Sequence, residues 1–195
     1  MKYLFLDIET IPIPILHEDI KTYLMDKKIT REQRNFDPNY SKIMLIGTKC
    51  QNEFKMFSGE EKILIQEFWD YLKEQRPTKI VTHNGYKFDI PFILLRSHLN
   101  NIKIPFPINT NHWQMHTSNH FDLMLFFSYQ ENFLNLNLEI LGKMHGIEVQ
   151  GERLEGNEIE KAYKKGEFHR IQEKCQQDIE ILEKLFEKFC VQTLQ

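Results

Sequence analysis

Two acidic residues, Asp7 and Glu9, stand two positions apart in a run of aromatic and branched residues that predicts a buried strand over residues 2–9. Successive side chains of a strand alternate between its faces, so both carboxylates are expected on one face, about 6–7 Å apart. Buried like charges repel each other and need compensation, which a bound metal ion would supply. The alternative is that this strand end reaches solvent and both acids are simply hydrated.

A second polar group follows the short strand expected over residues 79–82, where the chain reads H-N-G-Y-K-F-D from His83 to Asp89. A strand that runs into such a loop and then into a helix places polar side chains at its carboxyl end. Asp89 has two interpretations. It is either a functional carboxylate or the N-cap of the next helix, with Pro91 in the first turn, where its missing N–H costs nothing.

The third acidic position, Asp178, lies in an amphipathic helix expected over residues 171–189. It falls along the core-facing edge of the apolar stripe that contains Ile171 and Leu182. A carboxylate there is unfavourable unless it is paired or bound to a metal. The alternative is an ion pair with Lys174, one helical turn earlier.

Together, D-I-E-T in the first strand, H-N-x-x-x-F-D after a later strand and C-x-x-D in the last helix resemble the three motifs of the DEDD (DnaQ-like) exonucleases. That superfamily has an RNase H-like fold and removes nucleotides from 3′ ends. Residues 36–47 resemble the second strand of the proofreading domain of B-family DNA polymerases. Trp113, residues 120–123 and residues 163–175 resemble stand-alone predicted exonucleases related to that domain, so the resemblance extends over essentially the whole chain.

The resemblance implies a metal-dependent 3′–5′ exonuclease in which Asp7, Glu9, Asp89 and Asp178 are the catalytic residues and hold two ions, Mg²⁺ or Mn²⁺. Asp7 would bridge both ions. Hard divalent cations prefer carboxylate oxygens, and two of them stabilise the attacking and leaving oxygens of a phosphodiester during hydrolysis.

The same resemblance implies that the substrate is a single-stranded DNA or RNA 3′ end, released as nucleoside monophosphates. Glu9 would also contact the terminal nucleotide, and Thr10 would offer its backbone N–H. Asn84 and Phe88 would shape the slot for the last nucleotides, and Lys174 would hold a phosphate or neutralise an acid.

One position departs from the pattern. One branch of the superfamily has Tyr four residues before the last Asp, and the other has His five residues before it; here these positions are Lys174 and Glu173. A lysine is protonated at neutral pH and is a poor base. His145 and His169 are conceivable substitutes. We therefore expect a slow or unusually tuned nuclease, and the alternative is a catalytically impaired module that binds 3′ ends.

The order of the expected elements predicts an α/β fold with a mixed sheet flanked by helices. The resemblance implies that this fold is RNase H-like. Residues 17–40 read as a polar insertion with one short helix, and residues 100–119 read as a long loop. A hairpin is expected over 41–57, with its turn at Gln51-Asn52. A helix follows, which a Ser58–Glu61 capping box opens and which ends near Arg76. Further along the chain we expect a helix over 90–99, ordered structure over 121–127 and a short helix over 136–144. Asp122 is expected to cap a helix or to support the site.

Composition limits the function classes. The chain of 195 residues is 41% hydrophobic and 27% charged, which favours a single domain over residues 1–195 and argues against disorder. No apolar run is long enough to cross a membrane, and three cysteines without C-x-x-C spacing fit a reducing cytoplasm. The net charge of −3 excludes a basic protein that coats nucleic acid by neutralising phosphates.

Overall fold

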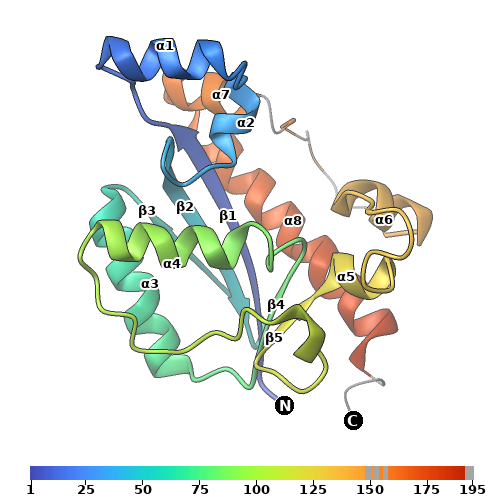
Figure 1. The fold of residues 1–195 in the computed structure, drawn as a ribbon. Helices are drawn as coiled ribbons and strands as arrows, with labels where there is room; N and C mark the ends of the chain where they lie inside the picture. Colours follow the sequence, from blue (N-terminus) through green and yellow to red (C-terminus); the bar gives the residue numbers. More distant parts are fainter. Residues whose placement is uncertain (148–150, 152–153, 156–157, 192–195) are drawn as a thin grey trace.

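The computed structural model describes residues 1–147, 151, 154–155 and 158–191. Five strands form one mixed sheet in the order β3-β2-β1-β4-β5, in which β1 is central (Figure 1). β1 pairs antiparallel with β2 and parallel with β4, which also pairs parallel with β5, and β2 pairs antiparallel with β3. The strands are β1 (Tyr3–Pro12), β2 (Ser41–Cys50), β3 (Glu53–Ser58), β4 (Lys79–Thr82) and β5 (His120–Asp122).

Helices cover both faces of the sheet, as the alternation of apolar residues along the strands requires (Figure 1). One core joins Leu4, Leu6 and Ile8 of β1 to α3 (Glu61–Gln75) and α4 (Asp89–Leu99). The opposite core is built on α8. The helices of that side are α5 (Leu123–Phe127), α6 (Leu138–Met144), α7 (Ile159–Lys165) and α8 (Phe168–Phe189). The expected α/β fold is therefore confirmed.

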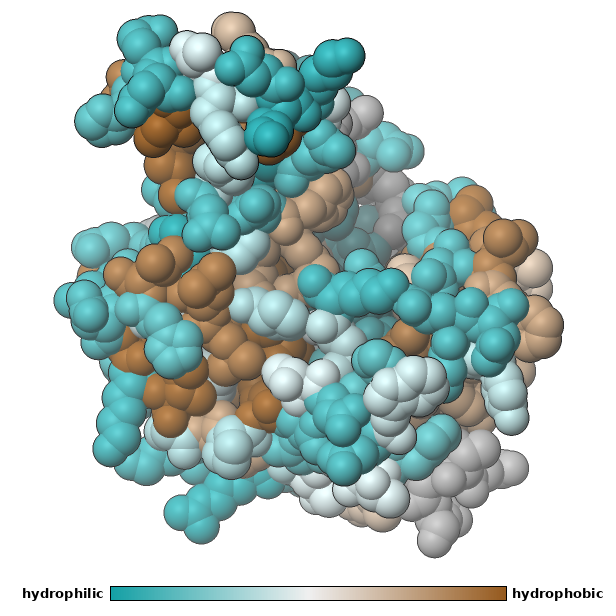
Figure 2. Space-filling view, in the orientation of Figure 1, coloured by the Kyte–Doolittle hydropathy of each residue, from teal (hydrophilic) through white to brown (hydrophobic). Residues whose placement is uncertain are grey.

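The polar insertion holds two helices, α1 (Glu18–Asp26) and α2 (Arg31–Asn35), so the prediction of one short helix was wrong. α2 begins with a capping box: the Gln33 amide donates to the Thr30 hydroxyl at 3.2 Å, and the Thr30 amide donates to the Gln33 side chain at 2.8 Å. This box allows a helix of five residues in a segment with weak periodicity. Figure 2 shows that the outer surface of this part of the molecule is mainly hydrophilic.

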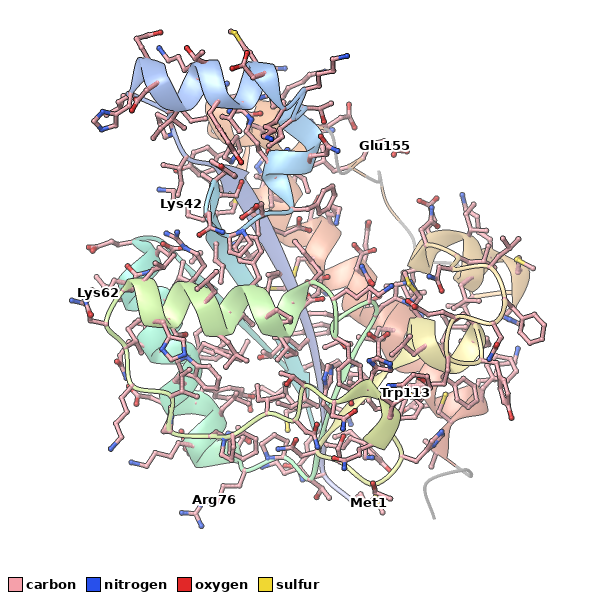
Figure 3. All side chains as sticks on the ribbon, in the orientation of Figure 1. Met1, Lys42, Lys62, Arg76, Trp113 and Glu155 are labelled. Atoms are coloured by element: carbon pink, nitrogen blue, oxygen red, sulfur yellow. The ribbon has the colours of Figure 1, made fainter. Side chains whose placement is uncertain are left out.

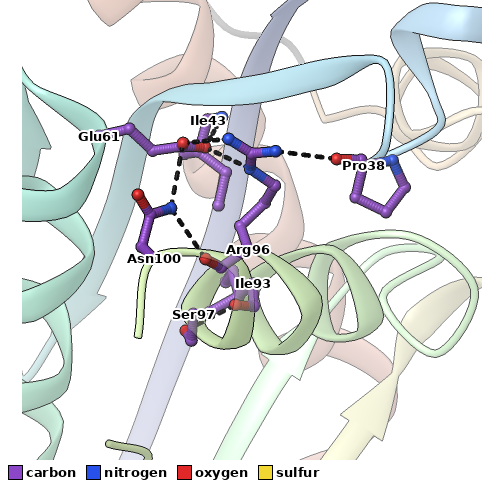
Figure 4. Close-up of polar contacts among 7 residues, drawn as sticks. All are labelled: Pro38, Ile43, Glu61, Ile93, Arg96, Ser97 and Asn100. Atoms are coloured by element: carbon purple, nitrogen blue, oxygen red, sulfur yellow. Dashed lines mark hydrogen bonds and ion pairs between the residues drawn. The ribbon is translucent and has the colours of Figure 1, made fainter. Parts of the chain in front are cut away.

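The capping box expected at Ser58 is wrong. Ser58 ends β3, and the N-cap of α3 is Glu60, which makes no side-chain cap bond. The Glu61 carboxylate instead accepts hydrogen bonds from the Ile43 amide at 2.7 Å and from the Arg96 guanidinium, which also donates to the Pro38 carbonyl at 3.0 Å (Figure 4). This buried ion pair fixes α4 against the start of β2 and against the end of the insertion.

The long loop between α4 and β5 contains a single 3₁₀ turn, η1 (His112–Gln114), and Trp113 on that turn is 74% exposed (Figure 3). The buried Lys79 ammonium ties the loop to the sheet by donating to the carbonyls of Met115 at 3.2 Å and His116 at 2.9 Å. None of the described helices is long and apolar enough to span a bilayer.

Candidate active site

The central strand β1 carries Asp7 and Glu9 on the face that α8 covers, because Leu4, Leu6 and Ile8 fill the core on the other face. Glu9 is 3% exposed, and Asp7 is half-buried. The alternative of hydrated acids at a strand end is therefore wrong. β1 continues to Pro12 beside β2, so Glu9 lies within the paired length of the strand rather than at its end.

Helix α8 brings Asp178 to the same place. Asp7 pairs with Gly47 of β2, and a side chain at Gly47 would meet Cys175 Sγ at 2.3 Å and Ile179 Cδ1 at 2.9 Å. The missing side chain lets α8 lie directly on the sheet. As a result, one carboxylate oxygen from each of Asp7, Glu9 and Asp178 lies within 4.8 Å of the others.

Asp89 reaches β1 from the other side. It is the first residue of α4, and the N-cap is Phe88, so the interpretation of Asp89 as the cap was wrong. Pro91 does lie in the first turn. Asp89 is 3% exposed, and its Oδ1 accepts a hydrogen bond from the Ile8 amide at 3.2 Å. Asp89 thus contacts the backbone between the two acids of β1 but is not one of the three whose oxygens converge.

Lys174 lies among the acids. Its ammonium donates to Glu9 Oε1 at 2.7 Å and to Asp178 Oδ2 at 2.8 Å. The ion pair with Asp178 that the helical spacing suggested is present, and Glu9 is a second partner from 165 positions away. Asp7 Oδ2 is buried and has no hydrogen-bond partner among the described residues.

Burial sets the electrostatics of the site. It raises the pKa of Asp7 well above the usual carboxyl value, and the Glu9 charge adds to the effect. Burial also raises the pKa of Asp89 to about 8. For Lys174, burial alone would lower the pKa, but Glu9, Asp178 and Asp7 outweigh it and raise the pKa well above the usual lysine value. The acids of the site therefore hold protons more tightly than exposed carboxyls do, although Lys174 lies among them.

A model of predicted 3′–5′ exonucleases related to the exonuclease domain of PolB matches residues 39–186. The chain belongs to this family. Exonuclease domains of this kind typically depend on divalent metal ions, and the convergent carboxylates with a buried oxygen that lacks a partner suit such ions. The match includes Asp89, Lys174 and Asp178, while Asp7 and Glu9 precede it.

The PolB-related fold is also seen in solved structures. The family B DNA polymerase from the hyperthermophilic archaeon Pyrobaculum calidifontis aligns with 96% of the chain at a TM-score of 0.71 and 17% sequence identity. The chain spans 24% of that polymerase's length. This likeness confirms the RNase H-like fold. None of the curated protein sequences matches the chain.

In this member of the PolB-related exonuclease family, Asp122 supports the loop after β4. It caps α5 by accepting from the Met124 amide at 2.9 Å, and it also accepts from the amides of Asn84 at 2.9 Å and Tyr86 at 3.0 Å. The helix-cap interpretation of Asp122 is therefore confirmed, and its other two bonds hold the loop that carries Asn84. Asn84 has a positive φ of 65°, which these bonds stabilise.

The residues expected to contact substrate lie around the acids. The Thr10 hydroxyl donates to the Asn35 carbonyl at 3.0 Å, and the strand register shifts between Glu9 and Thr10. Phe88 is half-buried, and Phe36, which is 68% exposed, packs edge-on against it with ring centroids 5.5 Å apart. The insertion thus adds an aromatic side chain beside Phe88, which spacing within the motifs could not show.

The three histidines near these elements differ in their surroundings. His145 packs against the rings of Phe127 and Phe189, and His169 is exposed on the first turn of α8. His83 is the first residue of the H-N-x-x-x-F-D motif, but the sequence assigned it no role. Its Nε2 lies 3.0 Å from the Leu136 carbonyl, and its Nδ1 is buried without a hydrogen-bond partner among the described residues. Burial lowers the pKa of His83, and the charges of Asp122 and Asp178 oppose this.

Without metal, the protein is expected to lose stability as the pH rises from about 4 to about 8. The folded Asp89 carboxyl keeps its proton up to a pKa of about 8, while the unfolded chain loses it near 3.8. The stabilisation is therefore complete below the unfolded value and is lost as the pH rises through the folded value. Urea unfolding in EDTA at about pH 5.5 and about pH 8 measures the difference.

Asp89→Asn is the control for this prediction, because it removes one titrating group and should reduce the pH dependence. Asp7 and Glu9, whose pKa values burial also raises, supply the remainder. Equal urea midpoints at both pH values for the unaltered protein would contradict the prediction. Addition of Mn²⁺ should raise stability most at the higher pH, since divalent ions bind the ionised carboxylates.

Proposed function

We propose that the chain is a divalent-metal-dependent 3′–5′ exonuclease that hydrolyses phosphodiester bonds at single-stranded DNA or RNA 3′ ends and releases nucleoside monophosphates. The observation that carries this proposal is the convergence of Asp7, Glu9 and Asp178, with one buried oxygen of Asp7 left without a partner among the described residues. Membership of the PolB-related exonuclease family supports it.

Asp7, Glu9, Asp89 and Asp178 would hold two ions, Mg²⁺ or Mn²⁺. When bound, such ions stabilise the negative charge that develops on the attacking and leaving oxygens of the phosphodiester. The protein's own part is to hold the carboxylates on a central strand and on two helices packed against it, so that little rearrangement is needed when the substrate arrives.

The substrate would enter beside the carboxyl end of β4. The backbone amide of Thr10, the side chain of Asn84 and the ring of Phe88 would position the last nucleotides. Aromatic rings stack on unpaired bases at about 1–3 kcal/mol per base, which favours a single strand. Lys174 would bind a phosphate only after its ammonium leaves Glu9 and Asp178.

Two further expectations belong to this proposal. Residues 1–195 would act as one RNase H-like domain. A cytoplasmic location stays a prediction that rests on cysteine usage; Cys50, Cys175 and Cys190 are buried.

The second candidate is a catalytically impaired module that binds 3′ ends. It is favoured by Lys174 at the position where one branch of the superfamily has Tyr. The two candidates differ in what a 5′-labelled single-stranded oligonucleotide shows after incubation with Mg²⁺ or Mn²⁺. A descending ladder supports the enzyme, while tight binding without a ladder supports the binding module. DNA and RNA oligonucleotides of one sequence, run in parallel, identify the substrate.

Lys174→Tyr is expected to raise the cleavage rate by about tenfold or more, because loss of a general base typically costs about 10²–10⁴-fold. The measured quantity is the rate of ladder formation at saturating Mn²⁺, compared between the variant and the unaltered protein. A matched control is Lys164→Tyr, since Lys164 forms an exposed ion pair with Glu160 on α7. An unchanged rate for Lys174→Tyr would direct attention to His83 or His169 as the group that orients water.

A further inference from the structure

The ammonium of Lys174 occupies the space between two of the three convergent carboxylates. Nζ lies 2.7 Å from Glu9 Oε1 and 2.8 Å from Asp178 Oδ2. The side chains are 14%, 4% and 11% exposed, respectively, so water offsets little of their charge. This is the arrangement of a cation held by protein oxygens, with an ammonium in place of a metal ion.

A divalent ion and this ammonium cannot share the same oxygens. A protonated amine has no lone pair to offer a metal, so Lys174 cannot become a ligand while it is charged. An ion bound to Glu9 and Asp178 would also lie within a few ångströms of Nζ, where two positive charges in a buried site repel strongly. Binding of an ion to Glu9 Oε1 and Asp178 Oδ2 therefore requires that the ammonium leave.

The structure permits that departure. Lys174 is carried by a flexible stem of four carbons, and its side chain is partly exposed, so the ammonium can move outward without a shift of α8. Cys175, next to it, is fully buried against the sheet and keeps the helix in place. Meanwhile Asp7 Oδ2 remains without a partner among the described residues, so it is available to an arriving ion.

We propose that Lys174 is a resident cation that neutralises Glu9 and Asp178 in the metal-free protein and competes with divalent ions for them. This inference rests on the proposed function and extends it: Lys174 sets how much metal the enzyme needs. It keeps the acids compensated and the site folded when metal is scarce, and it raises the metal concentration at which the site fills.

The test is the binding of Mn²⁺ to the whole protein, measured by titration calorimetry, together with thermal unfolding in EDTA and in Mn²⁺. Lys174→Met should bind Mn²⁺ about tenfold or more tightly than the unaltered protein. The ion no longer has to replace the hydrogen bonds from the ammonium, and one charge-assisted hydrogen bond corresponds to about a tenfold change in affinity. The same variant should unfold at a lower temperature in EDTA and recover more than the unaltered protein on addition of Mn²⁺.

Lys49→Met is the matched control. Lys49 on β2 forms an ion pair with Glu183 on α8, and the two side chains are 15% and 13% exposed, much like the pair at Lys174. Its loss should lower the unfolding temperature in EDTA and in Mn²⁺ alike and leave Mn²⁺ affinity unchanged. If Lys174→Met does not fold in EDTA, Lys174→Gln replaces it in the same measurements. Lys174→Arg keeps the positive charge and should therefore retain weak Mn²⁺ binding.

The outcomes separate this inference from the proposed function. Tighter Mn²⁺ binding by Lys174→Met or Lys174→Gln, but not by Lys49→Met, supports the inference. Measurable Mn²⁺ binding that is equal or weaker in both Lys174 variants overturns it and leaves the metal-dependent exonuclease standing. If neither the unaltered protein nor any variant binds Mn²⁺, the inference and the metal requirement fail together.

Discussion

Replacement of Asp7 by asparagine is expected to lower the cleavage rate by about 10³-fold or more and to raise the stability of the metal-free protein. Bound metal ions contribute several kcal/mol of transition-state stabilisation, which corresponds to a rate factor of that order. The stability should change in the opposite direction, because the variant removes a buried charge whose Oδ2 has no partner among the described residues.

The gain in stability should be about 1 kcal/mol or more, because the neutral amide is not repelled by Glu9 and Asp178 and its NH₂ can donate to their oxygens. Urea unfolding in EDTA gives the stability, and the oligonucleotide ladder gives the rate. The control is Asp26→Asn, because Asp26 is exposed at the end of α1 and should alter neither quantity. A variant that loses activity and stability together would mean that Asp7 is structural, and one that keeps full activity would remove Asp7 from the metal ligands.

Gly47→Ala is expected to cost about 10²-fold in rate, although Gly47 touches no substrate in the proposed mechanism. Its new methyl group would lie 2.3 Å from Cys175 Sγ, and both residues are on packed elements, so α8 must move away from β2. Asp178 is one turn further along α8. A displacement of about 1 Å at a catalytic group costs about 10²-fold. Overpacking should also lower stability by about 1–3 kcal/mol.

A double-mutant cycle with Cys175→Ala checks this explanation. Removal of the sulfur relieves the shortest contact and leaves only the ends of flexible side chains, Ile179 Cδ1 at 2.9 Å and Met56 Sδ at 3.2 Å. Gly47→Ala with Cys175→Ala should therefore recover much of the rate and stability that Gly47→Ala loses. The single variant Cys175→Ala measures the cost of the missing sulfur alone. If the double variant is no better than Gly47→Ala, the close contact with α8 is not the reason for the glycine.

Much of the fold could be predicted from periodicity. Alternation in the first strand placed Asp7 and Glu9 on one face, and the helical stripe of the last helix placed Asp178 at its core-facing edge. The hairpin turn at Gln51 and Asn52 is present, and both residues have the positive φ that such a turn requires. These features depend on neighbours in the sequence, which a pattern can show.

The wrong predictions concern contacts between distant segments. Ser58 and Glu61 have the spacing of a capping box, but Arg96 and the Ile43 amide bind the Glu61 carboxylate more favourably. In the same way, spacing could suggest that Lys174 pairs with Asp178 but could not show that its ammonium also binds Glu9. At both Glu61 and Lys174, an ion pair with a residue far away in the sequence determines the contacts of the side chain. Local sequence patterns do not contain this information.

The central place of β1 has a kinetic consequence. Its backbone pairs with β2 from Leu4 to Pro12 and with β4 at Tyr3, Leu4 and Phe5, and its faces are buried under helices, so its paired amides should exchange with solvent slowly. The short helices of the insertion can open at far lower cost. The carboxylates of Asp7 and Glu9 therefore lie on a slowly opening segment, and opening of the insertion need not displace them.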